Sequence, residues 1–203
     1  MLKLYHHPRS TYSRRVVMAL AEKEIPYHEI VLDMGSRQHR APDYLAINPY
    51  GRVPAIVEDD GFVLYESAAI LRYLEESHPE RPLLPGDVRQ RALADMYLRL
   101  CDGQMARYVG IIIFPKRFLP RQRWDLDAMA AAKAEIEKHL AILERQLAGH
   151  DYLVADQFSL ADLAYIPFLD FLPLMEIVPP PSVADWTERL LARPSAQASK
   201  PDM

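Results

Sequence analysis

The sequence predicts an α/β half followed by an all-helical half. Up to residue 78, short apolar runs of strand length alternate with segments whose apolar residues recur at helical spacing. Beyond residue 87 the long periodic segments all have helical spacing, and the stretch between the halves is rich in proline and other turn-forming residues. We therefore expect an N-terminal α/β domain over residues 1–78, a linker over 79–87 and a C-terminal helical bundle over 88–203.

The first half contains strand and helix patterns in a regular order. The expected strands cover residues 3–5, 27–32, 54–57 and 62–64, and the expected helices cover residues 12–23 and 66–77. The first two strands are joined through a helix, so they should lie parallel, whereas the turn Asp59-Asp60-Gly61 joins the last two as a hairpin. The order β-α-β followed by β-β-α is that of a thioredoxin-like domain.

The second half is divided by its periodicity and its prolines. A long helix is expected from Val88 past Cys101, and Pro115 and Pro120 mark its end or a kink. A stripe of apolar residues predicts another long helix over residues 126–147.

Further along the second half, Ser159 and Asp162 have the serine-then-acid spacing of an N-terminal cap. They precede an apolar run that continues to Leu172, and a final helix is expected to contain Val183, Trp186 and Leu190. Both features predict that the helical half continues close to the end of the chain.

Composition excludes several classes of function. The 203 residues carry a formal net charge of −4 with acidic and basic residues interspersed, so no nucleic-acid partner is expected. Neither a signal peptide nor an apolar run of membrane-spanning length is present, which favours a cytosolic location and no membrane partner. The single cysteine, Cys101, excludes an intrachain disulfide, and His6 and His7 lack the further ligands of a metal site, so no metal is expected.

Two short motifs carry chemistry that suits a small peptide. Pro54 opens a strand, and if the Val53–Pro54 bond is cis, the Val53 backbone offers its N–H and C=O to an extended ligand. Glu66 and Ser67 place a hydroxyl and a free backbone N–H where a helix begins, which is a carboxylate site. A strand-like contact beside a carboxylate contact matches a peptide of a few residues.

The order of these motifs resembles the cytosolic glutathione transferase family over essentially the whole chain. The matching segments are HHPRSTYSRRV, RQHRAPDYLAINPYGRVPAI, LYESAAILRYL and FSLADLAYIP. The first half is most similar to the serine-type members of the phi, delta and related bacterial classes. The resemblance implies a homodimeric detoxification enzyme that uses glutathione as co-substrate and conjugates it to a small hydrophobic electrophile.

By this resemblance, Ser10 is the catalytic residue, as a hydrogen-bond donor to the glutathione thiolate. A charge-assisted hydrogen bond of roughly 1.5–3 kcal/mol would lower the pKa of the thiol by about one to two units. Tyr5 is the alternative, because tyrosine-type members place their catalytic hydroxyl at the end of the first strand, and Tyr12 and Ser13 carry further hydroxyls. Ser10 is also well placed to cap the following helix, and both roles are compatible.

The resemblance also implies the residues that bind glutathione. Glu66 and Ser67 match the pair that holds the γ-glutamyl end, and Val53, before Pro54, matches the residue that pairs with the cysteinyl part. The remaining candidates are basic residues on loops, for which simple solvation is the competing interpretation: His39, Arg40 and Arg52. Arg14 and Arg15 are interpreted as salt-bridged or solvated helix residues.

Two further surfaces follow from the resemblance. Tyr50 matches an aromatic residue that inserts into the partner subunit of a homodimer, although a turn tyrosine also packs on its own domain. An apolar wall for the second substrate is expected from Tyr108, Ile111, Phe114 and Phe118. The run Ile111-Ile112-Ile113 has a competing interpretation as core.

The sequence departs from the family pattern at Ala155, and its motifs are also compatible with two other functions. Ala155 stands where the family usually has glycine, and a positive φ there would carry a strain of roughly 1–2 kcal/mol. The same thiolate would also serve a glutathione-dependent isomerase or peroxidase. A non-catalytic binding module with the same fold is the alternative outside enzymes.

Overall fold

The computed structural model describes residues 1–84 and 86–201 and divides into two compact units. Unit 1 comprises Met1–Leu83 and Pro194–Met203, and unit 2 comprises Leu84–Arg193. The α/β half followed by a helical half is confirmed as the fold class. The boundaries differ from the expected 1–78 and 88–203, because the last helix lies with unit 1.

Unit 1 is built on a mixed four-stranded sheet. Its strands are β1 (Leu2–His6), β2 (Tyr27–Val31), β3 (Ala55–Val57) and β4 (Val63–Tyr65), in the order β2-β1-β3-β4. The pair β1 and β2 is parallel, while β3 is antiparallel to both β1 and β4. The predicted parallel pair and the predicted hairpin are both present.

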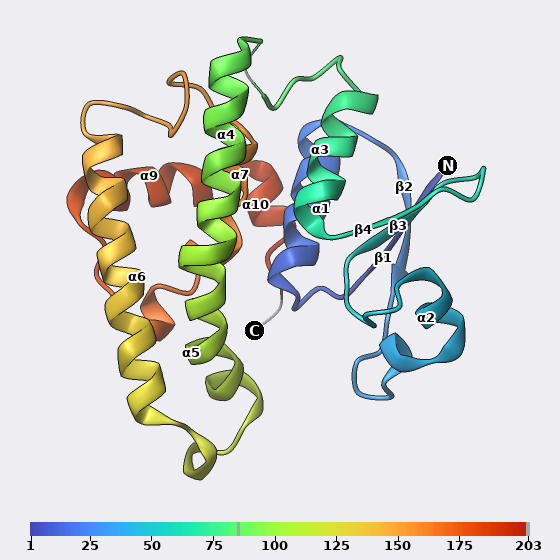
Figure 1. The fold of residues 1–203 in the computed structure, drawn as a ribbon, viewed down its shortest axis with the longest axis horizontal. Coiled ribbons are helices and arrows are strands. Elements are labelled where there is room, and N and C mark those ends of the chain that lie inside the picture. Colours follow the sequence, from blue (N-terminus) through green and yellow to red (C-terminus); the bar gives the residue numbers. More distant parts are fainter. Residues whose placement is uncertain (85, 202–203) are drawn as a thin grey trace. The chain divides into compact units, whose positions relative to one another are not determined.

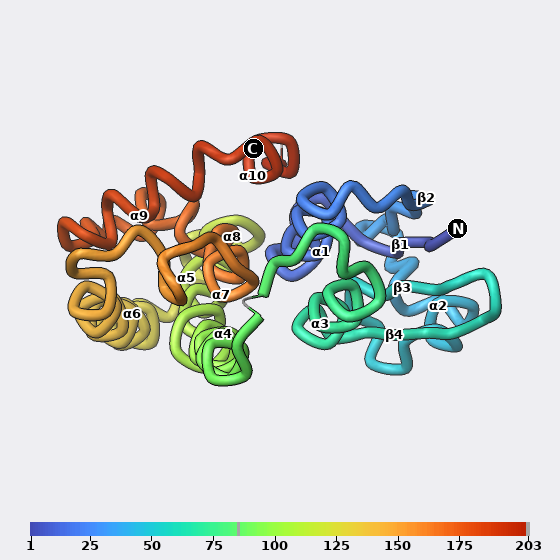
Figure 2. The backbone as a smooth tube through the Cα atoms, turned by 90° about the horizontal axis from the view of Figure 1, so that it is seen from above, coloured from blue at the N-terminus to red at the C-terminus, as the bar shows by residue number. Residues whose placement is uncertain are grey.

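Helices cover both faces of this sheet, as Figures 1 and 2 show. The helices α1 (Thr11–Glu22) and α3 (Ser67–Ser77) lie on one face, and α2 (Pro42–Ile47) lies on the other. Because side chains alternate along a strand, Leu4 of β1 is fully buried towards α1 and α3, whereas Tyr5 packs against Tyr44 of α2. The sequence interpretation treated residues 42–47 as loop, since a six-residue helix is too short to show a period.

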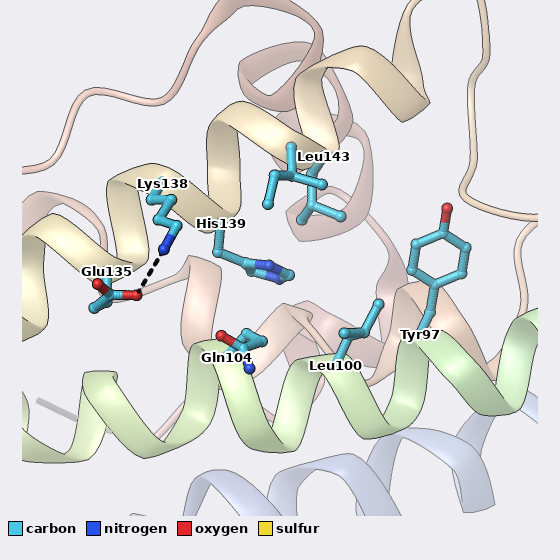
Figure 3. A pocket seen from close by; sticks show the side chains of 8 residues that line it. Tyr97, Leu100, Gln104, Glu135, Lys138, His139 and Leu143 are labelled. Atoms are coloured by element: carbon cyan, nitrogen blue, oxygen red, sulfur yellow. Dashed lines mark ion pairs between the residues drawn. The ribbon is translucent and has the colours of Figure 1, made fainter.

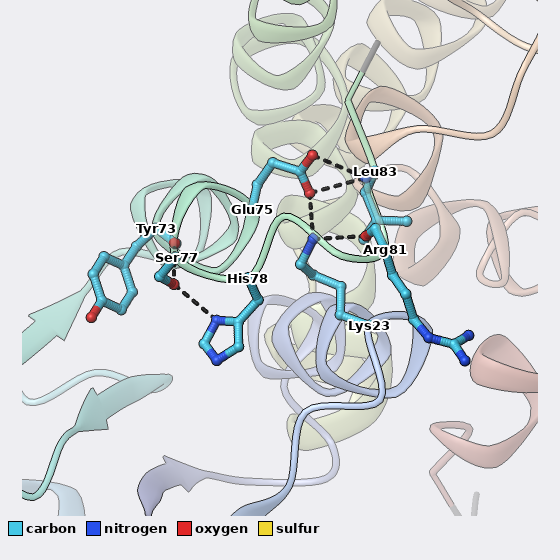
Figure 4. Close-up of polar contacts among 7 residues, drawn as sticks. All are labelled: Lys23, Tyr73, Glu75, Ser77, His78, Arg81 and Leu83. Atoms are coloured by element: carbon cyan, nitrogen blue, oxygen red, sulfur yellow. Dashed lines mark hydrogen bonds and ion pairs between the residues drawn. The ribbon is translucent and has the colours of Figure 1, made fainter. Parts of the chain in front are cut away.

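A buried ion pair holds residues 81–83 against the helices α1 and α3 of unit 1 (Figure 4). The Lys23 ammonium lies 2.7 Å from the Glu75 carboxylate and donates to the Arg81 carbonyl oxygen at 2.8 Å. Both Glu75 oxygens accept from the Leu83 backbone N–H, at 3.0 and 2.9 Å. Residues 81–83 are therefore held by α1 and α3 and belong to unit 1.

The last helix, α10 (Pro194–Ala198), packs on α1. The buried Arg14 guanidinium donates to the Ala196 carbonyl oxygen at 3.0 Å and to the Ser199 hydroxyl at 3.3 Å. At the other end of α1, the Ser195 hydroxyl donates to the Glu22 carboxylate. These contacts explain why the end of the chain groups with unit 1.

Unit 2 is helical. Its helices are α4 (Val88–Leu100), α5 (Arg107–Phe118), α6 (Leu126–Leu147), α7 (Leu160–Leu163), α8 (Ile166–Leu169) and α9 (Pro181–Leu191). A π-helical segment, Cys101–Ala106, joins α4 to α5 without a break, and α5 contains Pro115 and ends before Pro120. Within the part of the chain that the structure describes, no helix is long and apolar enough to cross a bilayer.

Candidate functional site

The strand register brings three loops of unit 1 to one edge of the sheet. Tyr5 of β1 pairs with Ala55 of β3, which pairs with Tyr65 of β4. The loop that follows β1, the turn that precedes β3 and the start of the helix after β4 therefore meet at this edge. They carry Ser10, the Val53–Pro54 bond and the Glu66-Ser67 pair, respectively.

Ser10 caps the first helix at this edge. Its backbone is extended, and its hydroxyl oxygen accepts from the Ser13 backbone N–H at 3.2 Å. The first turn of α1 contains no acidic residue, so no carboxylate there offsets the positive end of the helix. Because the Ser10 oxygen accepts from within the protein, its own proton is available to a ligand. Ser10 therefore caps the helix, and its donation to a ligand stays a prediction.

Tyr5 occupies a different environment. Its ring lies 5.8 Å from the Tyr44 ring, on the face of the sheet that α2 covers. It packs against a buried cluster of Leu32, Tyr44 and Ala55. Of the two further hydroxyl candidates that the sequence offered, Tyr12 is exposed and Ser13 is fully buried.

Hydrogen bonds from the Tyr44 and Asn48 side chains hold the turn that precedes β3. The Val53–Pro54 bond is cis. The Arg52 carbonyl oxygen accepts from the Tyr44 hydroxyl and, at 2.8 Å, from the Asn48 side-chain amide. Burial raises the pKa of Tyr44 to about 12, so its hydroxyl keeps the proton that it donates. Sequence reasoning missed both donors, because no local pattern marks a hydroxyl that reaches eight residues ahead.

The basic residues of the loop before α2 lie against the same turn. Gly51 has φ +57°, and a Cβ there would come within 2.7 Å of the His39 carbonyl oxygen. Arg40 donates to the Tyr50 carbonyl oxygen at 3.2 Å. Partial burial, with the charges of Arg40 and Arg37, lowers the pKa of His39, whose Nδ1 is buried without a hydrogen-bond partner. His39, Arg40 and the exposed Arg52 are thus brought to one loop cluster with Val53.

The start of α3 presents open hydrogen-bond donors. Glu66 precedes the helix with φ +72°, and no side chain caps the helix at this residue. Ser67, the first helical residue, is buried, and its hydroxyl oxygen accepts from the Arg15 guanidinium at 3.4 Å. Arg15 itself is fully buried, so of its two interpretations, salt-bridged or solvated, the solvated one is wrong. An uncapped helix start beside a serine hydroxyl suits a carboxylate.

The expected second-substrate residues lie on α5 of unit 2. Ile111, Phe114 and Phe118 are 37%, 56% and 50% exposed and follow one side of the helix, while Tyr108 is half-buried. The Phe114 and Phe118 rings lie 5.3 Å apart. Ile112 and Ile113 are buried, so the apolar run is divided between core and surface.

Unit 2 also contains a small apolar cavity of about 170 Å³ (Figure 3). Its lining comes from α4, the π-helical segment and α6, and comprises Tyr97, Leu100, Gln104, Glu135, Lys138, His139, Ile142 and Leu143. The buried His139 ring lies 3.0 Å from the Tyr165 hydroxyl, and burial lowers its pKa to about 4. The imidazole is therefore neutral near pH 7.

Tyr50 lies at the edge of the sheet, on the turn that precedes Val53. The Tyr50 side chain is 62% exposed, with its ring 6.0 Å from that of Tyr65 on the edge strand β4. Over residues 1–84 and 86–201, no three His, Cys, Asp or Glu side chains are grouped so as to hold a metal ion.

Known proteins match both halves of the chain. Residues 9–77 match "Glutathione S-transferase, N-terminal domain", and residues 114–194 match "Glutathione S-transferase, C-terminal domain". A glutathione S-transferase of Silene vulgaris is 31% identical over 207 residues, covering 96% of this chain and 94% of that protein. The solved structure of glutathione transferase F2 from Populus trichocarpa is 29% identical, with a TM-score of 0.89 over 98% of this chain and 97% of that one.

A bacterial structure is similar over the same length. A glutathione transferase homologue from Sulfitobacter, solved with bound glutathione, is 27% identical, with a TM-score of 0.84 over 98% of this chain and 97% of that one. Fold and strand register together define a thioredoxin-like unit with a candidate site at one edge of its sheet, followed by a helical unit. The chain belongs to the glutathione S-transferase family. The family resemblance is confirmed, whereas the serine type and the class stay predictions.

Proposed function

We propose that this protein is a glutathione transferase whose unit 1 binds glutathione and stabilises its thiolate through Ser10. The observation that carries the proposal is the strand register, which brings a capped helix start, the Val53–Pro54 turn and an uncapped helix start to one edge. The glutathione named in the Sulfitobacter structure supports the choice of ligand. Glutathione is a co-substrate here, and the reaction is its conjugation to an electrophile.

The chemistry assigned to Ser10 is the donation of one hydrogen bond to sulfur. The thiolate, and not the thiol, is the nucleophile. The Ser10 oxygen accepts from the Ser13 backbone N–H, and this directs the hydroxyl proton outward to the ligand. The positive end of α1 favours the same negative charge. Attack of the thiolate on the electrophile forms the carbon–sulfur bond. In a substitution the electron pair leaves with the displaced group, and in an addition it moves to the atom next to the attacked carbon, which takes up a proton.

The tripeptide is assigned along the edge in three parts. The γ-glutamyl carboxylate binds at the open start of α3, where Ser67 supplies a hydroxyl and Glu66 attracts the ammonium. The cysteinyl backbone pairs with Val53, next to Pro54. The glycine carboxylate is assigned to the loop cluster of His39, Arg40 and Arg52, which contains two cations.

The test is the ultraviolet difference spectrum of bound glutathione against pH, for wild type, Ser10→Ala and Tyr5→Phe. We expect the pKa of the bound thiol to lie below that of free glutathione and to rise by about one to two units in Ser10→Ala alone. A rise confined to Tyr5→Phe would move the role to the tyrosine. A wild type that binds no thiolate would contradict the transferase.

The electrophile and the partner subunit are assigned to two exposed aromatic surfaces. We assign the hydrophobic electrophile to the α5 surface formed by Tyr108, Ile111, Phe114 and Phe118, two of whose rings are in contact. Phe114→Ala should then raise the KM for a chloronitrobenzene and leave the KM for glutathione unchanged. Tyr50 is assigned to a homodimer contact, which Tyr50→Ala should weaken in sedimentation experiments, and the location assigned to the protein is the cytosol.

A further inference from the structure

Arg15 is a fully buried cation to which the proposed function gives no role. Its guanidinium stays protonated at any physiological pH, so burial requires hydrogen-bond acceptors or a ring face around it. One of its nitrogens donates to the Ser67 hydroxyl oxygen at 3.4 Å. Its central carbon also lies 5.2 Å from the centre of the Tyr12 ring, within the range of a cation–π contact.

This contact joins the two helices whose starts form the candidate site. The helices α1 and α3 lie side by side on one face of the sheet (Figure 1). Arg15 reaches from the second turn of α1 to Ser67, the first residue of α3. A residue 52 positions away in the sequence therefore decides what the Ser67 hydroxyl can do.

A serine hydroxyl has one proton and two lone pairs, so its partners determine its direction. With Arg15 on its oxygen, Ser67 has its proton free to donate away from the guanidinium. The backbone N–H groups of the first turn of α3 point out of the same helix end, which no side chain caps at Glu66. The Ser67 hydroxyl and the backbone N–H groups at the start of α3 are therefore placed to donate hydrogen bonds to the same anion.

We propose that Arg15 is a positioning residue for the recognition of a carboxylate, the α-carboxylate of the γ-glutamyl group. It holds the Ser67 hydroxyl as a donor and adds a buried positive charge behind it, without touching the peptide. The inference rests on the proposed function, because it deepens the assignment of that same site. It predicts selectivity for ligands that carry this one carboxylate.

The chain offers a matched control in the neighbouring residue. Arg14 is also buried, at 5% exposure, and lies on the same helix. It donates to the Ala196 carbonyl oxygen and the Ser199 hydroxyl, away from α3. Arg14→Met therefore removes a buried guanidinium from α1 without changing the partner of Ser67.

The experiment compares two peptides by isothermal titration calorimetry. One is glutathione, and the other is γ-aminobutyryl-cysteinylglycine, which lacks only the γ-glutamyl α-carboxylate. Both dissociation constants are measured for wild type, Arg15→Met, Arg15→Lys, Ser67→Ala, the double variant Arg15→Met/Ser67→Ala, and Arg14→Met. Far-ultraviolet circular dichroism and a melting curve establish that each variant is folded.

The quantity that decides is the ratio of the two dissociation constants. We expect wild type to favour glutathione, and Arg15→Met to reduce that preference roughly tenfold, as the loss of a charge-assisted hydrogen bond would. Ser67→Ala should reduce it similarly, the double variant no further, and Arg14→Met not at all. A purely structural role for Arg15 would weaken the binding of both peptides equally and leave the ratio at its wild-type value.

The outcomes separate this inference from the proposed function. Failure of the wild type to bind either peptide would contradict the proposed function. A wild type that prefers glutathione while Arg15→Met keeps the same ratio overturns only the role of Arg15. Should Arg15→Met fail to fold, the ratio is taken from Arg15→Lys, whose single ammonium lacks the planar fork, and an unchanged ratio there overturns the role as well.

Discussion

Two helices of this protein begin with serine and acid residues close together, and they use them in opposite ways. At α7, Ser159 and Asp162 form a reciprocal cap: the Asp162 carboxylate accepts from the Ser159 backbone and hydroxyl, both at 3.0 Å. At α3, the acid precedes the serine, and Glu66 is exposed and caps nothing. The order of two residues thus separates a closed helix start from an open one.

The closed start is completed by its surroundings. The other oxygen of Asp162 accepts from the Leu153 backbone and from the Trp186 indole, each at 3.0 Å. Burial raises the pKa of Asp162, against the effect of these hydrogen bonds. Four internal donors leave this carboxylate nothing to offer a ligand, so the α7 start serves stability. The α3 start leaves its donors at the sheet edge, where the Ser10 loop and the Val53–Pro54 turn meet it.

The largest expected effect tests the closed start. Asp162→Ala leaves four buried donors without an acceptor, and we expect the free energy of unfolding to fall by about 3–5 kcal/mol. Urea denaturation measures it, with Asp127→Ala, an exposed acid in the first turn of α6, as the control. At a temperature where the variant is folded, its affinity for glutathione should equal that of wild type. A loss of affinity without a loss of stability would break the comparison.

The next prediction concerns stability against pH and involves His139, a buried basic group of unit 2. Its pKa is lowered by burial from 6.5 to about 4, so between these pH values the unfolded chain holds a proton that the folded chain lacks. The free energy of unfolding should therefore fall as the pH drops through this window, by about 3 kcal/mol in total. In His139→Gln this part of the pH dependence disappears. Urea titrations at pH 7 and pH 4.5 measure it, and equal pH dependence in both proteins would refute the assignment.

A smaller effect is expected at the open start of α3, where Ser67 is the residue to substitute. Ser67→Ala removes one hydroxyl donor, and we expect roughly a tenfold loss of glutathione affinity. Because the buried Arg15 guanidinium also loses an acceptor, the free energy of unfolding should fall by about 1–2 kcal/mol. Ser159→Ala is its counterpart at α7, and should change stability and leave affinity untouched. Calorimetric titration and urea denaturation of both variants decide between them. If the two alanine variants behave alike, the distinction between open and closed starts is wrong.

The sequence predicted the long helices because their helical period extends over several turns, and the strands because turn-forming residues bound their short apolar runs. The parallel pair of β1 and β2, the hairpin and the helix Leu126–Leu147 follow the predicted pattern. The helices α2 and α10 were missed, since five or six residues do not establish a period. The expectation for residues 88–203 did not include α10 packing on α1, which depends on a buried Arg14.

Within the candidate site, the residues that stand in motif segments were predictable and those that support them were not. Ser10, Val53 and Ser67 stand in recognisable segments, so their places followed from motif order. Tyr44 and Arg15 act through partners that lie eight and 52 residues away. Local patterns describe an arginine on a helix as a surface residue, and only the folded chain supplies the acceptor that buries it.

The smallest expected effect concerns the loop that leads into the closed start. Ala155 has φ +53°, as the sequence interpretation anticipated for a position where the family usually has glycine. Ala155→Gly removes left-handed strain of roughly 1–2 kcal/mol and gives part of it back as unfolded-chain entropy, leaving a gain of about 1 kcal/mol. For a chain of this size the melting temperature should rise by about 2–4 °C.

Asp156, with φ +54°, supplies the control for that measurement. Aspartate tolerates this conformation better than alanine, and its carboxylate accepts from the Asp151 backbone N–H at 2.6 Å. Asp156→Gly should therefore gain nothing in melting temperature. Glutathione affinity should stay unchanged in both variants. Ala155 and Asp156 lie in the loop before α7, and the groups that cap the start of α7 are already paired within the protein. A loss of glutathione affinity in Ala155→Gly would contradict this expectation, because it would show that the backbone conformation of the loop before α7 affects the candidate site of unit 1.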